Sequence, residues 1–253
     1  MTGLRAVFFD LDGVIVDTER DGHRVAFNLA FKEYGFDDQW DVDYYHELLR
    51  IGGGKERMRH HWETRGFSKP VPADKIDTLI REMHERKTAI FVDLIEKGKL
   101  PLRPGVHRFM QEVEQRPLKL GVCTTSNEKA AEAITETLLP DIRFEVILAG
   151  DVVQKKKPDP EVYMLALSRL KLEPGEAFVI EDSSNGVESA AGAGLRVVAT
   201  TNEYTENEDL SAADIIVTCL GDPDGEKGKL VKGNLDFDGV LHLSDVEAYF
   251  ARQ

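Results

Sequence analysis

The sequence is poor in cysteine and tryptophan, and it has no long apolar run and no excess of basic residues. Neither Cys123 nor Cys219 has a second Cys or His at metal-ligand spacing, which argues for two reduced thiols. The first apolar run, Ala6–Phe9, stops at Asp10 and is too short for a secretory signal or a membrane span. We therefore expect a cytoplasmic protein, or a plastid one if the source is a photosynthetic eukaryote.

The charge balance limits the partners of the chain. The net charge is −14, so nucleic acid or an anionic membrane would be bound only through a local basic patch. We expect neither partner, and we expect a monomer. With 253 residues, 42% hydrophobic and 31% charged, the chain is long enough for one large domain or for a core with an inserted smaller one.

Short apolar runs rich in β-branched residues alternate with stretches of helical period. This alternation predicts an α/β fold, a Rossmann-like parallel sheet covered by helices on both faces. The predicted strands are Ala6–Leu11, Leu118–Cys123, Val146–Leu148, Ala177–Ile180, Arg196–Ala199 and Ile215–Val217. The Gly-, Asp- and Lys-rich segment Gly221–Gly239 is expected to be a surface excursion before a last helix, Leu243–Phe250.

The alternation of strands and helices is interrupted between the first strand and the others. Residues 19–100 show helical patterns and no convincing strand, and they end near Leu102-Arg103-Pro104-Gly105, a segment suited to a hinge. We therefore predict a catalytic core of residues 1–18 and 101–253 with an inserted α-helical cap domain, 19–100, which acts as a lid.

Two carboxylates follow the first predicted strand. Asp10 and Asp12 point the same way because side chains alternate along an extended chain, and Gly13 lets the backbone turn away. In a doubly wound sheet, ligands bind at the carboxyl ends of the strands. Such a pair suits a hard cation together with a nucleophile and an acid or base. Calcium loops and ordinary turns contain similar clusters.

Three further polar segments each follow a predicted strand. Thr124, Ser126 and Asn127 precede a helix, where hydroxyls and free N–H groups bind anions, although plain N-capping uses the same residues. Lys157 precedes a proline just before a helix, which would aim one lysine of a surface run at a phosphate. Glu181 and Asp182 are either helix caps or metal ligands. Because all four segments occur in order, each just after a predicted strand, we do not attribute them to coincidence.

These segments resemble the four signature motifs of the haloacid dehalogenase superfamily, in order and over most of the chain, with the insertion where that superfamily has a helical cap. Asp17-Thr18-Glu19 looks like its sugar-phosphatase and phosphoglucomutase branch. The chain is similar to CbbY-type proteins in particular. The segments that carry this similarity are Asp21–Arg24, Trp40–Asp43, Gly52–Arg57, Arg86–Thr88 and Ala149–Val153.

The resemblance implies a two-step mechanism. Asp10 attacks phosphorus to give an aspartyl-phosphate, and Asp12 protonates the leaving sugar oxygen and then activates water. Mg²⁺ would be held by Asp10, the main-chain carbonyl of Asp12 and Asp182, with Glu181 as an occasional ligand. Lys157 and Thr124 would bind the phosphoryl oxygens. An acid such as Asp12 is needed for an alkoxide leaving group, so dehalogenation is disfavoured.

The resemblance also places substrate recognition in the cap. Lys55 and Arg57 follow three glycines and would hold a phosphate, or would belong to a solvated helix start. Lys87 interrupts the apolar stripe of its predicted helix, so it either snorkels to solvent or points at an anion. Glu19 and His23 would contact sugar hydroxyls, although a lone histidine is more often structural. Ser126 and Asn127 complete the predicted substrate contacts.

The activity implied is a Mg²⁺-dependent phosphatase of a small phosphorylated sugar, xylulose 1,5-bisphosphate in the CbbY-type family. One alternative is a β-phosphoglucomutase-like enzyme, which the core motifs alone do not distinguish, although Glu19 and the glycines beside Lys55 favour the phosphatase. The other is a non-catalytic binding protein on the same fold, which the presence of Asp10, Asp12 and Lys157 disfavours.

Overall fold

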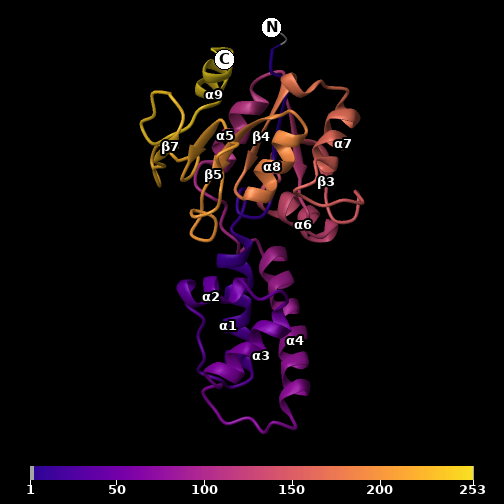
Figure 1. Ribbon diagram of the computed structural model, residues 1–253, viewed down its shortest axis with the longest axis vertical. Coiled ribbons are helices and arrows are strands. Elements are labelled where there is room, and N and C mark those ends of the chain that lie inside the picture. The colour runs from indigo at the N-terminus through magenta and orange to yellow at the C-terminus, as the bar shows by residue number, and fades with distance from the viewer. Residues whose placement is uncertain (1–2, 253) are drawn as a thin grey trace. The chain divides into compact units, whose positions relative to one another are not determined.

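The computed structural model describes residues 3–252, and the chain divides into two compact units (Figure 1). The first unit runs to Asp17 and resumes at Pro101, and the second is Thr18–Leu100. The chain therefore leaves the first unit once, shortly after its first strand, and returns once.

The first unit is built on a seven-stranded sheet in the order β3-β2-β1-β4-β5-β6-β7. All neighbouring strands are parallel except β6 and β7. The strands are β1 (Ala6–Phe9), β2 (Lys119–Cys123), β3 (Phe144–Leu148), β4 (Ala177–Glu181), β5 (Arg196–Thr200), β6 (Ile215–Val217) and β7 (Leu230–Lys232).

Helices cover both faces of this sheet because its central strands are apolar on both sides. Phe8 of β1 belongs to the buried cluster that includes α7 and α8, whereas the ring of Phe9 contacts that of Phe109 in α5 at 6.3 Å between centroids. Phe178 of β4 contacts Phe109 and also Phe250 of α9. The helical elements of this unit are α5 (Val106–Glu114), α6 (Glu128–Leu138), α7 (Glu161–Leu170), the 3₁₀ turn η2 (Pro174–Glu176), α8 (Ser184–Gly192) and α9 (Leu243–Ala251).

The register of the central strands aligns their carboxyl ends. Phe9 at the end of β1 pairs with Val122 of β2 and with Ile180 of β4. The residues that follow these strands, among them Asp10 and Asp182, therefore meet at one edge of the sheet.

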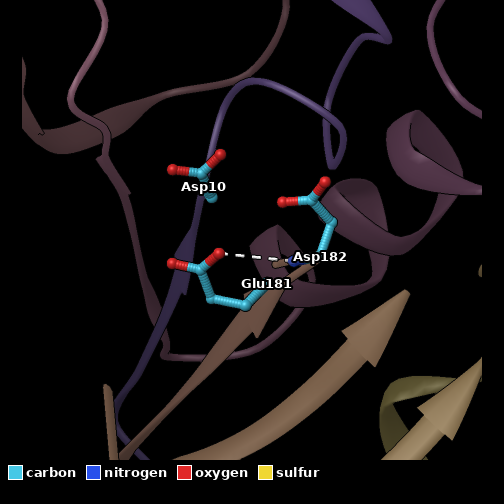
Figure 2. Close-up of side chains that lie close together, drawn as sticks. All are labelled: Asp10, Glu181 and Asp182. Atoms are coloured by element: carbon cyan, nitrogen blue, oxygen red, sulfur yellow. Dashed lines mark hydrogen bonds between the residues drawn. The ribbon is translucent and has the colours of Figure 1, made fainter. Parts of the chain in front are cut away.

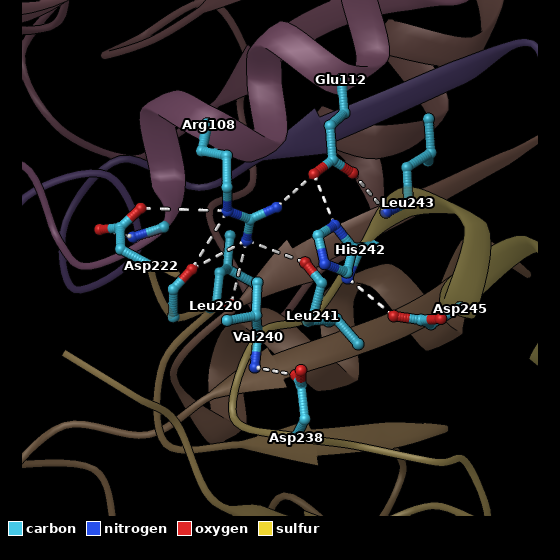
Figure 3. A network of polar contacts seen from close by, with 12 residues as sticks. Arg108, Glu112, Leu220, Asp222, Asp238, Val240, Leu241, His242, Leu243 and Asp245 are labelled. Atoms are coloured by element: carbon cyan, nitrogen blue, oxygen red, sulfur yellow. Dashed lines mark hydrogen bonds and ion pairs between the residues drawn. The ribbon is translucent and has the colours of Figure 1, made fainter. Parts of the chain in front are cut away.

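The segment Gly221–Gly239 is mostly exposed and precedes the last helix, and it also contains the short edge strand β7, which pairs antiparallel with β6. Its base is held by Arg108 of α5, which donates hydrogen bonds to the main-chain oxygens of Leu220, Gly221 and Leu241 (Figure 3). Glu112, one turn later, accepts from His242 Nδ1 (2.8 Å) and from the amide of Leu243, where α9 begins. Local sequence does not show these contacts, so neither β7 nor the part played by Arg108 was predicted.

The second unit is helical. It consists of the π-helix η1 (Thr18–His23), α1 (Arg24–Glu33), α2 (Val42–Leu49), α3 (Gly54–Thr64) and the long helix α4 (Ile76–Glu96). Its core is aromatic, with Phe27, Phe31 and Tyr45 around a fully buried Trp40. No strand occurs between Thr18 and Leu100, all of which the structure describes.

The predicted fold class is confirmed: a Rossmann-like, mostly parallel sheet with helices on both faces, interrupted by a helical segment. The assignment of a catalytic core and a substrate-binding cap, with boundaries at residues 18/19 and 100/101, remains a prediction. Within residues 3–252, none of the helices combines the length and the apolar character that crossing a bilayer requires.

Candidate active site

Three carboxylates converge at the carboxyl ends of β1 and β4. Asp10 follows β1, Glu181 ends β4 and Asp182 follows it, and each offers a carboxylate oxygen within 4.8 Å of the others (Figure 2). All three side chains are buried. Buried carboxylates at this spacing repel one another unless cations compensate them, so the arrangement is costly and points to a function.

Lys157 supplies one positive charge to this cluster. Its Nζ lies 2.6 Å from Asp10 Oδ1, 2.6 Å from Glu181 Oε1 and 2.8 Å from the main-chain oxygen of Cys123. Burial opposes the charge of Lys157, but Asp10 and Glu181 together outweigh burial and raise its pKa. Glu181 also accepts a hydrogen bond from the buried hydroxyl of Tyr163. Lys157 is therefore a cation fixed beside Asp10.

The negative charges of Asp10 and Asp182 are not fully compensated by nearby positive charge. Burial, reinforced by the charges of Glu181 and Asp12, raises the pKa of Asp10 to about 8 even though Lys157 lowers it. Burial also raises the pKa of Asp182 well above its ordinary value, and Asp10 and Glu181 add to that effect. Even with Lys157 beside Asp10 and Arg103 acting on Asp182, positive charge falls short of the three carboxylates, and a divalent cation would supply the difference.

The donor set fits Mg²⁺, which favours one or two carboxylates with waters and substrate oxygens. Asp10 and Asp182 suit this task. Both oxygens of Glu181 already accept hydrogen bonds, Oε1 from Lys157 and Tyr163 and Oε2 from the amide of Asp182 at 3.3 Å. Glu181 is therefore better placed to hold Lys157 than to bind a metal.

The segment after β2 contacts Asp12. Ser126 donates its hydroxyl to Asp12 Oδ2, and its amide donates to Thr124 Oγ1 at 3.1 Å. Thr124 is buried, next to Cys123, whose carbonyl accepts from Lys157. Asn127 is exposed, and its side chain caps α6 by accepting from the amide of Lys129. The structure thus brings Ser126 to the carboxylate of Asp12, places Thr124 in contact with Ser126 and shows Asn127 as a helix cap.

Three residues at this site were missed by the sequence analysis. They are Tyr163, which donates to Glu181; Asn202, whose Nδ2 lies 2.8 Å from Asp182 Oδ2; and Arg103, which donates to the carbonyl of Gly13. Arg103 stands in the hinge segment and Asn202 two residues after β5, a strand end like those of the four motifs. That position was the signal available for Asn202, whereas a tyrosine in the apolar stripe of α7 gives none.

In the helical unit, Glu19, Tyr45 and Arg57 form a polar group. Tyr45 donates its hydroxyl to Glu19 Oε2 at 2.6 Å, and Arg57 Nη1 lies 3.3 Å from the Tyr45 oxygen and 3.8 Å from Glu19. Arg57 Nε donates to the carbonyl of Ile51. Of these residues, Tyr45 was not predicted.

Lys87 and His23 form a second polar pair in this unit. Lys87 Nζ lies 2.8 Å from His23 Nδ1 and over the rings of Phe27 (4.7 Å) and Phe91 (5.4 Å). Burial lowers the pKa of Lys87 to about 8, and burial together with Lys87 lowers that of His23 to about 3. At neutral pH the lysine is therefore mostly charged and the histidine neutral. Lys87 does not snorkel to solvent, since its side chain is buried.

Lys55 is exposed. It lines a hollow of about 260 Å³ together with Glu56, Arg59, Asp77, Ile80 and Arg81, and none of Glu19, His23, Arg57 and Lys87 lines that hollow. Two of the three glycines before Lys55 are required by the local structure. Gly53 has φ 96°, and a Cβ on Gly54 would lie 2.6 Å from His84 Nε2.

Comparison with known protein families gives one matching description, "Haloacid dehalogenase-like hydrolase", over residues 7–200. This range begins in β1 and ends in β5, so it contains the whole carboxylate cluster and the helical unit.

Individual relatives match over most of the chain. A CBBY-like protein of Arabidopsis thaliana is 47% identical over 226 residues, covering 88% of this chain and 71% of the relative. A phosphorylated carbohydrates phosphatase of Thermotoga maritima is 30% identical over 84% of this chain and 93% of its own length. A crystal structure of a mutant CbbY from Rhodobacter sphaeroides in complex with xylulose-(1,5)bisphosphate is 37% identical, with a TM-score of 0.63, and covers 85% of this chain and 94% of that one.

Proposed function

Because the chain belongs to the haloacid dehalogenase-like hydrolases, among the CbbY-like proteins, we propose that it is a Mg²⁺-dependent phosphatase whose substrate is xylulose 1,5-bisphosphate. The resemblance drawn from the four motifs and the predicted class, a phosphatase-type hydrolase, are confirmed by this membership. The observation that carries the proposal is the buried carboxylate cluster of Asp10, Glu181 and Asp182 with Lys157 in hydrogen-bond contact.

The metal would be held by Asp10, Asp182 and the main-chain carbonyl of Asp12. When bound, it would neutralise the charge of the carboxylates and of the phosphoryl group. Lys157 would carry out the same task from the protein side, since its ammonium is fixed beside Asp10 Oδ1.

Asp10 is the proposed nucleophile. One of its carboxylate oxygens attacks phosphorus, the bond from phosphorus to the sugar oxygen breaks, and an aspartyl-phosphate forms. Asp12 gives its proton to the leaving sugar oxygen and afterwards takes a proton from the water that attacks the aspartyl-phosphate. That water breaks the bond between phosphorus and the Asp10 oxygen and restores the free carboxylate. Ser126 holds the Asp12 carboxyl by a hydrogen bond, and Thr124 is proposed to bind a phosphoryl oxygen.

The polar groups of the helical unit are proposed to bind the sugar and its second phosphate. Arg57 and Lys87 provide positive charge in an acidic chain, and Glu19 suits sugar hydroxyls. His23 is neutral because its pKa is about 3, so it can hydrogen-bond a hydroxyl without repelling Lys87. The complex of a CbbY relative with xylulose-(1,5)bisphosphate supports this choice of ligand. Lys55 is proposed as a further contact of the phosphate.

The test is phosphate release with and without Mg²⁺ on xylulose 1,5-bisphosphate, ribulose 1,5-bisphosphate, β-glucose 1-phosphate and p-nitrophenyl phosphate. We expect fast release that requires Mg²⁺ and is selective for xylulose 1,5-bisphosphate. Conversion of glucose 1-phosphate to glucose 6-phosphate without phosphate release would instead support the mutase alternative. Asp10→Asn is the control, since it removes the nucleophile while preserving the side-chain volume. Phosphate release by this variant would contradict the proposed mechanism.

A further inference from the structure

Asn202 links the end of β5 to the carboxylate cluster. It stands two residues after Thr200, and its Nδ2 donates a hydrogen bond to Asp182 Oδ2 at 2.8 Å. No motif used in the sequence analysis contains it. Asn202 itself has no carboxylate, so its contribution to the site would be made through Asp182.

The orientation of the Asn202 amide is fixed by its own turn. Its Oδ1 accepts from the amides of Tyr204 at 2.9 Å and Thr205 at 3.1 Å, and its main-chain amide lies 3.2 Å from Thr205 Oγ1. The two accepted bonds identify that end of the amide as the oxygen, so the end facing Asp182 is the NH₂ donor. Rotation of the side chain would break these bonds, and the donor is therefore held in place.

Asp182 needs such a partner because its surroundings are negative. Asp10 and Glu181 each offer a carboxylate oxygen within 4.8 Å of one of its own, and the Asn202 NH₂ group donates to its Oδ2. Gly13 packs against the same pair: a Cβ on it would overlap the Asp182 carboxylate and lie 2.9 Å from Asn202 Nδ2. The carboxylate is thus confined between the loop after β1 and the turn after β5.

We propose that Asn202 is a positioning residue, which holds the Asp182 carboxylate in the orientation that binds a divalent cation and so sets the affinity of the chain for Mg²⁺. The inference rests on the metal site of the proposed function. Partners that orient a metal-binding carboxylate typically contribute about 10- to 100-fold to metal affinity.

The test compares Asn202→Ala with Thr205→Val in the full chain. Asn202→Ala removes the two turn hydrogen bonds accepted by Oδ1 together with the donor to Asp182, whereas Thr205→Val removes one turn hydrogen bond and leaves that donor. Mg²⁺ affinity is measured by isothermal titration calorimetry, and folding is checked by the thermal midpoint in EDTA. We expect Asn202→Ala to bind Mg²⁺ about 10- to 100-fold more weakly, and Thr205→Val to bind it within about twofold of the wild type. The rate of phosphate release by Asn202→Ala should recover at high Mg²⁺.

Wild-type Mg²⁺ affinity in Asn202→Ala would overturn the inference, and so would an equal loss in Thr205→Val, because the turn rather than the donor would then be responsible. A wild-type chain that binds no Mg²⁺ would overturn it as well. Failure of this inference can be distinguished from failure of the proposed function. If the wild type binds Mg²⁺ but releases no phosphate, the activity proposal fails while the affinity comparison still decides the part played by Asn202.

Discussion

The Asp182 carboxylate occupies the space that a side chain on Gly13 would need. Gly13 has φ 81°, a region that L-residues with a Cβ rarely adopt, and a Cβ there would overlap Asp182 Oδ2. Residue 13 therefore has to be glycine for two independent reasons: the backbone conformation of the turn after Asp12, and the close approach of the carboxylate of Asp182, the residue that follows β4.

Gly13→Ala is expected to destabilise the chain by about 1–3 kcal/mol from backbone strain alone, and to displace Asp182. Urea unfolding in EDTA measures the first effect, and Mg²⁺ titration the second. Gly175→Ala is the matched control, since no atom lies within 4 Å of its added Cβ and its φ is not positive. Wild-type stability and Mg²⁺ affinity in Gly13→Ala would show that the loop relaxes freely, contrary to this view.

Lys157→Met should leave Asp10 and Glu181 buried without their shared cation. We expect a loss of about 3–5 kcal/mol in unfolding free energy without Mg²⁺, together with loss of phosphate release. Adding Glu181→Gln removes one of the unpaired charges, so the double variant should regain part of the stability but none of the activity. A single variant as stable as the wild type would contradict the pairing of Lys157 with both carboxylates.

Arg103→Lys tests how the loop after Asp12 is held. The guanidinium donates to four oxygens, those of the Gly13 carbonyl, the Thr200 hydroxyl and the Thr201 and Thr218 carbonyls. Because a lysine has one nitrogen, it cannot span these positions, and we expect a loss of about 3 kcal/mol in urea unfolding. The control Arg116→Lys lies at an exposed position and should change stability by less than about 0.5 kcal/mol. Equal losses of stability in the two variants would mean that the hydrogen bonds of Arg103 do not stabilise the loop after Asp12.

Lys87 should make substrate binding depend on pH. Its pKa of about 8 means that the ammonium is lost as pH rises through 8, so KM for a bisphosphate should increase between pH 7 and 9. KM for p-nitrophenyl phosphate should change far less, and Lys87→Met should abolish the difference. Lys97→Met, at an exposed lysine just after α4, is the control. An equal change of KM with pH for both substrates would show that Lys87 does not bind the second phosphate.

The same pKa shift predicts a stability effect of definite sign. Since the folded state binds fewer protons at Lys87 than the unfolded state between pH 8 and 10.5, this group raises stability as pH rises through that window. At pH 7 its burial costs about 3 kcal/mol, at 1.36 kcal/mol per pKa unit. Lys87→Met should therefore be more stable than the wild type at pH 7, with a gain that shrinks toward pH 10. Urea unfolding across this pH range measures the gain in stability. A gain that does not change with pH would contradict a buried charge on Lys87.

Much of the first unit was predictable because its signals are local. The apolar runs of β1 and β4 are continuous, since both faces of these strands are covered, and each run ends where a polar side chain begins. Parallel neighbours then bring Asp10 and Asp182 to one edge of the sheet. Lys87 was also detectable from periodicity alone, because a charge in an apolar stripe is conspicuous.

By itself, the sequence determined the α/β class, the place of the helical insertion and the identity of the carboxylates and the lysine at the strand ends. Only the tertiary structure decided that Asp10 and Glu181 share Lys157. It also decided that Tyr163 donates to Glu181 and Asn202 to Asp182, and that Arg103 donates to the carbonyl of Gly13. The reason is physical. Strand ends are encoded by neighbouring residues, whereas these hydrogen bonds join residues far apart in the chain and depend on the paths of β5, the hinge segment and α7.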